Sequence, residues 1–204
     1  MATYSFESDV HYYQGSWNTH KFGSTSNGGS IAGELNEDYR AIVGITIKPD
    51  ENEIVTAFTL KIGYLSTYNV ATCLGGYLYD SLTTAKSSVS GAPAGYMAHA
   101  KESEAAVPTA SGRMAALTFE GLYIKEETTV YVWFYVDPSG HSQIWTGASG
   151  NVKKPTVEVT AIVGGIVYID DGTSIEAYRF FIDNGEGWEQ HRPHIDNSEG
   201  WDLC

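Results

Sequence analysis

The chain of 204 residues has few cysteines and few basic residues, and each shortage removes a class of protein. Two cysteines, Cys73 and Cys204, provide neither a disulfide framework nor the close spacing of a zinc motif. Lys and Arg number 12 against 25 acidic residues, which gives a net charge of −13. Because this charge repels a phosphate backbone, we expect no nucleic acid among the partners.

Long apolar runs and a signal-like N-terminus are also missing. No stretch approaches the roughly 18 apolar residues of a membrane span. The first ten residues have neither a basic segment nor an apolar one, so they do not form a signal peptide. We therefore expect a soluble protein made in a cytosol, without membrane insertion.

The motifs of familiar catalytic and cofactor sites are missing as well. The six histidines form no HExxH motif and have no cysteine partner at metal-ligand spacing. The glycines form neither GxGxxG nor a P-loop. Asp137, Ser139 and His141 share one short turn, where three side chains do not converge as they do in a triad. We predict a non-enzymatic protein with no catalytic residue, no metal and no cofactor.

Glycine, tyrosine and β-branched residues are abundant, and their arrangement is typical of β-structure. The chain has 22 glycines and 14 tyrosines, and runs of helical period are missing. Residues 54–65 alternate between an apolar face, with Phe58, Leu60 and Ile62, and a more polar one, which predicts a half-buried strand. Further strands are predicted at residues 3–6, 41–48, 71–79, 114–119, 128–136, 143–145 and 156–163.

The number and spacing of these strands predict an all-β fold, a jelly-roll-like two-sheet β-sandwich over residues 1–163. Residues 81–107 are small and polar, and we interpret them as a long surface excursion with one short strand at 96–100. The pair Gly75-Gly76 predicts a bulge or a close backbone approach inside a strand.

The segment 129–136 is apolar on both faces, which predicts a central strand. One face is aliphatic with a phenylalanine, and the other carries two tyrosines and a tryptophan. Aromatic rings stack on sugar faces, so this second face is a candidate carbohydrate site. The alternative is that its rings form a second buried layer of the sandwich. A loop site drawn from the excursion at residues 81–107 is equally arguable. The candidate ligand-binding residues are Tyr131, Trp133, Tyr135 and Trp145.

After a Gly-rich linker at residues 164–167, three copies of a 13-residue repeat occupy residues 168–204, the third being truncated. Each copy has isoleucine at its second position, aspartate at its third, and isoleucine or tryptophan at its eighth. A turn such as Asn184-Gly185 lies between these positions, so each copy is predicted to be a β-hairpin. The recurring apolar residues are Ile169, Ile175, Ile182, Trp188, Ile195 and Trp201.

One short hairpin is marginally stable, and three still make a thin core. We therefore expect the apolar residues of the tail to be buried against the sandwich or against the tails of other copies. Residues 166–204 contain nine acidic and two basic residues, which is more than half of the net charge. We interpret this excess as a solvated surface. The repeat lacks the complete pattern of a calcium loop.

The repeat Ile-Asp-Asn-Gly-Glu-Gly-Trp at 182–188, with its near copy at 195–201, resembles the C-terminal endings of structural and tail-associated proteins of bacteriophages and prophages of Gram-positive, gut-type bacteria. The resemblance implies localisation in a virion, contacts with other virion proteins and a homo-oligomer, with a trimer as the favoured count. It implies no catalytic residue. The sandwich resembles jelly-roll carbohydrate-binding modules in strand pattern.

Besides a hydrolase without familiar catalytic motifs, two hypotheses follow for the function. The first is a phage virion protein of the tail-fibre, receptor-binding or decoration type, which assembles through its repeat tail and presents a domain that contacts a host surface. The second is a stand-alone, lectin-like module that recognises a cell-wall or capsular glycan. A host cell-surface glycan is an expected partner under both hypotheses.

Overall fold

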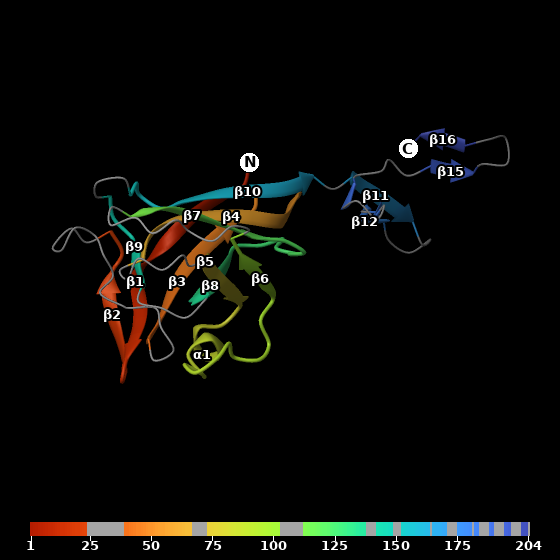
Figure 1. The fold of residues 1–204 in the computed structure, drawn as a ribbon. Helices are drawn as coiled ribbons and strands as arrows, with labels where there is room; N and C mark the ends of the chain where they lie inside the picture. The colour runs from red at the N-terminus through yellow and green to blue at the C-terminus, as the bar shows by residue number, and fades with distance from the viewer. Residues whose placement is uncertain are drawn as a thin grey trace.

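The computed structural model describes residues 1–23, 39–66, 73–102, 112–137, 142–148, 152–163 and 165–170, and then residues 175–180, 182–183, 188–189, 194–196 and 201–203. Beyond Val163 the description is of the backbone and its pairing. Within this part of the chain the fold is an all-β sandwich of two antiparallel sheets, followed by three two-stranded hairpins (Figure 1).

The larger sheet has six strands, which lie in the order β2 (Trp17–Lys21), β1 (Thr3–Gln14), β3 (Tyr39–Lys48), β8 (Thr128–Asp137), β5 (Cys73–Tyr79) and β6 (Ala98–Lys101). The smaller sheet has the order β10 (Thr156–Val163), β4 (Glu53–Ser66) and β7 (Arg113–Phe119), with β9 (Ser142–Trp145) paired to the end of β4. The helix α1 (Leu82–Ala85) is a single turn between β5 and β6.

Three antiparallel pairs are nested in sequence: β3 with β8, β4 with β7, and β5 with β6. The first and third pairs lie in the larger sheet and the second in the smaller one. A long antiparallel ribbon rolled into two sheets gives this nesting, which is the connectivity of a jelly roll. Residues 80–97, which connect the innermost pair β5 and β6, contain α1 and turns. The predicted all-β sandwich of two sheets is confirmed.

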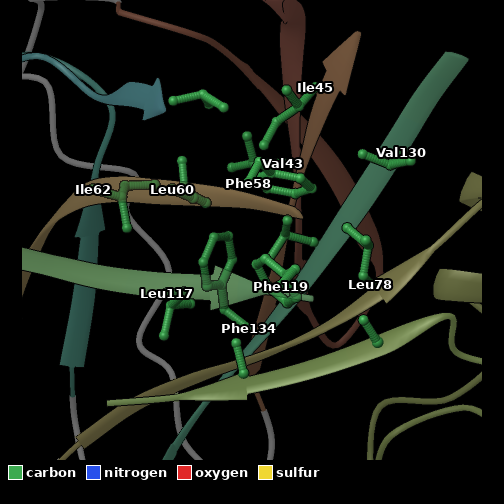
Figure 2. Close-up of a cluster of buried hydrophobic side chains, with 14 of the residues drawn as sticks. Val43, Ile45, Phe58, Leu60, Ile62, Leu78, Leu117, Phe119, Val130 and Phe134 are labelled. Atoms are coloured by element: carbon green, nitrogen blue, oxygen red, sulfur yellow. The ribbon is translucent and has the colours of Figure 1, made fainter. Parts of the chain in front are cut away.

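The core lies between the two sheets and is made of aliphatic and phenylalanine side chains (Figure 2). Phe58 on β4 and Phe119 on β7 are cross-strand partners whose ring centroids are 5.1 Å apart, and both are fully buried. Opposite them, β8 points Val130, Val132 and Phe134 into the same core. The alternation of apolar residues read from the sequence therefore marks the inner face of each of these strands.

The larger and smaller sheets are tied together at one edge by a partly buried ion pair. Arg113, at the start of β7, donates two hydrogen bonds of 2.5 and 2.6 Å to the carboxylate of Glu102, which follows β6. The same carboxylate accepts the backbone N–H of Leu74 at 2.9 Å. The pair is bidentate and largely shielded from water, which gives it a fixed geometry.

The strand boundaries agree closely with the sequence in some places and poorly in others. The strand predicted at 156–163 has the observed bounds of β10, whereas the strand predicted at 3–6 extends to Gln14 as β1. The short strand predicted at 96–100 is β6, two residues further along. The predicted strand 71–79 is observed from Cys73, and its first two residues lie outside the described part.

The tail contains three hairpins, one in each copy of the repeat. They pair β11 (Gly165–Asp170) with β12 (Ile175–Phe180), β13 (Ile182–Asp183) with β14 (Trp188–Glu189), and β15 (His194–Asp196) with β16 (Trp201–Leu203). Strand β11 begins at Gly165, inside the range 164–167 that we predicted to be a linker. The turns between the strands lie outside the described residues.

The buried phenylalanine pair gives a direct test of the core. Phe119→Ala should lower the free energy of unfolding by about 3–5 kcal/mol, because it removes a fully buried ring and leaves a cavity against Phe58. Ala116→Ser, on the exposed face of the same strand, is the matched control and should change it by less than about 0.5 kcal/mol. Urea denaturation measures both; similar losses in the two variants would contradict this core.

Candidate functional site

The outer face of the larger sheet, which points away from the core, carries a band of aromatic side chains. Strand alternation puts Tyr131, Trp133 and Tyr135 on this face of β8, as predicted, because Val132 and Phe134 point into the core. One row runs across four neighbouring strands through direct cross-strand partners. It consists of Ile42, Trp133, Tyr77 and His99.

One half of this face is covered by the segment 80–97. Trp133 is 1% exposed and packs in a second buried cluster with Ile42, Tyr79 and Ala85 of α1. The guanidinium of Arg40 lies 5.0 Å from the Trp133 ring centroid, in cation–π geometry. Trp133 therefore belongs to a second buried layer, which was the alternative predicted from the sequence. Its ring is not accessible to a ligand.

Two hydrogen bonds hold the segment 80–97 on the sheet. The indole Nε1 of Trp17, on β2, donates to the carbonyl oxygen of Lys86 at 3.2 Å. The hydroxyl of Tyr79, on β5, donates to the carbonyl oxygen of Pro93 at 2.7 Å. Burial raises the pKa of Tyr79 to about 12, so this hydroxyl keeps its proton at neutral pH. The segment is therefore anchored to two strands, near its middle and near its end.

The other half of the face, beside the edge strand β6, is open to solvent. Four rings meet there, and we call them the aromatic shelf: Tyr77, Tyr96, His99 and Tyr135. Tyr77 is at the centre, with ring centroids at 4.9 Å to Tyr96, 4.4 Å to His99 and 5.4 Å to Tyr135. His99 and Tyr96 are exposed, whereas Tyr77 and Tyr135 are half-buried.

The shelf depends on a glycine of β5. Gly75 is the cross-strand partner of Tyr135, and a Cβ at Gly75 would overlap with the Tyr135 ring. The tyrosine ring therefore lies over the bare backbone of β5, where it reaches His99. Its hydroxyl is 2.7 Å from His99 Nε2. The sequence predicted either a bulge or a close approach to the backbone at Gly75-Gly76. The register from β5 to β8 is continuous through both glycines, so there is no bulge and the close approach is confirmed.

The protonation states within the shelf follow from its burial. Desolvation, with Tyr77 and Asp137 nearby, raises the pKa of Tyr135 to about 12. Desolvation and the charge of Lys101 lower the pKa of His99 below its ordinary value. At neutral pH both groups are therefore uncharged, and the tautomer of the imidazole decides which of them donates the hydrogen bond.

The two remaining sequence candidates lie away from the shelf. Tyr131 is half-buried, and its hydroxyl donates to Glu7 Oε1 at 3.4 Å. Trp145 belongs to β9 in the smaller sheet, where Ile144 points into the core and Trp145 therefore faces outward. Of the four predicted residues, the structure brings Tyr135 into the shelf and puts Trp145 on the other sheet.

Three shelf residues were not predicted from the sequence. Tyr77 belongs to a strand whose alternation was recognisable, so its face could have been assigned from the neighbouring Leu74 and Leu78. His99 joins it through the pairing of β5 with β6, and Tyr96 lies just before β6; this pairing has no signal in a single sequence. The small, polar surroundings of both residues favoured a surface excursion with one short strand at 96–100.

The tail residues predicted to be buried are Ile169, Ile175, Ile182, Trp188, Ile195 and Trp201. They lie on the hairpin strands, but their side chains are outside what the structure describes, so their burial stays a prediction. Among the residues whose structure is described, no helix is long and apolar enough to cross a membrane. Within the same residues, no group of three or more His, Cys, Asp or Glu side chains is arranged to hold a metal ion.

The fold and the shelf together define a class: an all-β sandwich that carries an exposed aromatic surface on one sheet. Comparison with models of known protein families, with curated proteins and with solved structures finds no match for this chain.

Gly75 gives a test of how the shelf is built. Gly75→Ala should cost about 1–3 kcal/mol of unfolding free energy, because the methyl group and the Tyr135 ring cannot occupy the same space. Gly91→Ala, at a glycine with open space around it, is the control. In a Tyr135→Ala background the cost of Gly75→Ala should largely disappear, so a double-mutant cycle in urea measures the contact. Additive effects would contradict it.

The histidines of the outer face predict a pH dependence. Burial and nearby Lys86 lower the pKa of His11, and the pKa of His99 is also lowered, both from an ordinary 6.5. The unfolded chain then binds more protons than the native one below pH 6.5, so stability should fall as the pH drops from 7.5 to 5.5. Asp9 and Asp50 have pKa values lowered from 3.8 and do not titrate in this window.

Thermal unfolding at the two pH values measures this loss. His11→Gln and His99→Gln should each reduce the difference in Tm between pH 7.5 and 5.5, and the double variant should reduce it further. An unchanged difference in the double variant would show that other groups cause the pH dependence.

Proposed function

We propose that this chain is a non-enzymatic virion protein of the tail-fibre, receptor-binding or decoration type. In this proposal the sandwich is a surface-contact domain, and the repeat tail joins copies of the chain into a homo-oligomer. A trimer is the favoured count because of the resemblance to phage tail-associated proteins.

The observation that carries the proposal is the contrast between the two parts of the chain. The sandwich has a continuous core of buried residues drawn from both sheets. The tail strands pair in separate two-stranded sheets of two to six residues per strand. An isolated two-stranded hairpin is marginal in water, so the tail needs a partner surface to become stable.

The regularity of the tail supports assembly over incidental packing. In the three hairpins the same repeat positions are cross-strand partners: Asp170 with Ile175, Asp183 with Trp188, and Asp196 with Trp201. Equivalent hairpins present equivalent surfaces, which favours repeated contacts of one kind, as between copies of the same element. A single docking contact on the sandwich would not require three equivalent hairpins.

A second candidate function is a stand-alone, lectin-like module. The observation that favours it is the aromatic shelf. On the same face of the sheet the neighbouring aromatic cluster is buried, whereas the shelf is exposed. The two candidates differ in oligomeric state: a stand-alone module is a monomer, and a virion protein of this type is an oligomer.

Light scattering coupled to size-exclusion chromatography tests the assembly role of the tail. The full-length protein, whose chain mass is 22.2 kDa, should elute as an oligomer, and a protein truncated after Val163 should be a monomer. Truncation after Pro193, which removes the third copy, should weaken the oligomer so that its mass falls on dilution.

A monomeric full-length protein would contradict the assembly role and favour the stand-alone module. An oligomer that persists after truncation at Val163 would move the subunit contact to the sandwich. Far-UV circular dichroism of each truncated protein checks that the sandwich is folded.

A further inference from the structure

We propose that the aromatic shelf binds an uncharged pyranose ring of a surface glycan, with Tyr96 as the ring on which the sugar stacks. This inference rests on the proposed role of the sandwich as a surface-contact domain and adds the ligand class and the site. It differs from the sequence-based candidates, of which Tyr135 alone belongs to the shelf.

Tyr96 is an aromatic residue that the fold holds in place while leaving half of its surface exposed. Before it, Pro93 is bound through its carbonyl oxygen by Tyr79, and Gly95 turns the chain with φ +85°. After it, the N–H of Met97 donates to the carbonyl oxygen of Leu78 at 2.7 Å. Tyr96 is nevertheless 50% exposed. A ring fixed in this way loses little conformational entropy when a ligand binds.

The Tyr96 ring is also supported from the side. Its edge-to-face contact with Tyr77 has a centroid distance of 4.9 Å and an interplanar angle of 61°. Tyr77 in turn stacks on His99 at an interplanar angle of 27°. The shelf therefore offers ring surface with an imidazole N–H and tyrosine hydroxyls beside it. A pyranose has the matching chemistry, since its C–H face is apolar and its rim carries hydroxyl groups.

The electrostatics of the shelf and of the whole chain favour an uncharged sugar. At neutral pH His99 and Tyr135 carry no charge, because the pKa of His99 is lowered and that of Tyr135 is raised to about 12. The nearest cation, Lys101, forms an ion pair with Asp137. The chain as a whole has a net charge of −13, which repels polyanionic glycans. A neutral glycan meets neither an unpaired charge at the shelf nor this repulsion.

Three other aromatic positions fit a sugar less well. Trp133 is covered by α1, and Tyr131 is engaged with Glu7. Tyr123 is 66% exposed, but within the described residues its ring contacts no other aromatic ring. It therefore serves as the matched control, an exposed tyrosine outside any shelf.

Affinity electrophoresis in native gels tests the proposal on the full-length protein. The gels contain one polysaccharide each: dextran, yeast mannan, galactomannan, hydroxyethyl cellulose or glycol chitin as the panel of uncharged or N-acetylated glycans, and alginate as the polyanion. At least one uncharged polysaccharide should retard the protein, and alginate should not. Tyr96→Ala should weaken the retarding interaction about tenfold, as expected for loss of an aromatic anchor.

Three further variants make the result specific. Tyr96→Phe should retain binding within about threefold, because the ring remains. His99→Ala should weaken binding, and Tyr123→Ala should leave it unchanged. Thermal unfolding of Tyr96→Ala should match the wild type, since half of the side chain is in solvent. Retention by no uncharged polysaccharide, or equal retention of wild type and Tyr96→Ala, would overturn the proposal.

The oligomeric state of the same preparation separates this inference from the proposed function. An oligomer that no uncharged glycan retards would overturn the glycan site and leave the assembly role standing. A monomer that binds through Tyr96 would overturn the assembly role and leave the glycan site standing.

Discussion

The structure depends on one constraint: β8 is apolar on both of its faces and must be covered on both. The inner face, with Val130, Val132 and Phe134, is covered by the smaller sheet. The outer face is too large and too aromatic to remain in water, and a two-sheet sandwich has no third sheet to cover it. The segment 80–97 lies over part of it, so the chain builds a local third layer from one helical turn and its flanking loops.

This third layer is incomplete, and the shelf is the part it leaves open. Anchors at Trp17 and Tyr79 fix the segment over Trp133, and the chain then returns to the sheet as β6. Tyr77, His99 and Tyr135 beyond this point contact one another, and Tyr77 also contacts Tyr96. The same packing that buries the tryptophan therefore leaves a supported aromatic surface beside it.

Local patterns in the sequence predicted the strands. The aromatic shelf, in contrast, is formed by pairing between strands that are distant in the sequence. The period-2 pattern identified the two faces of β8 and the bounds of β10. Alternate residues of a strand lie on opposite faces, so the polarity of each residue indicates whether its face is buried. The Gly75-Gly76 pair signalled a close backbone approach without naming the residue that approaches. Trp145 resembled the other aromatics in composition, yet it lies on the other sheet, because membership of a sheet is a property of topology. His99 could not be assigned without the register of β6.

In this sandwich the nested strand pairs that the fold requires are distinct from the segment that covers part of the outer face. β3 with β8, β4 with β7, and β5 with β6 form the frame, and residues 80–97 connect the innermost pair. The exposed positions of that segment lie outside the paired strands, so substitutions there change the outer face and leave the pairing of the frame intact. The surface beside the shelf can therefore vary, in the way that antibody loops vary on a constant sandwich, without a change of fold.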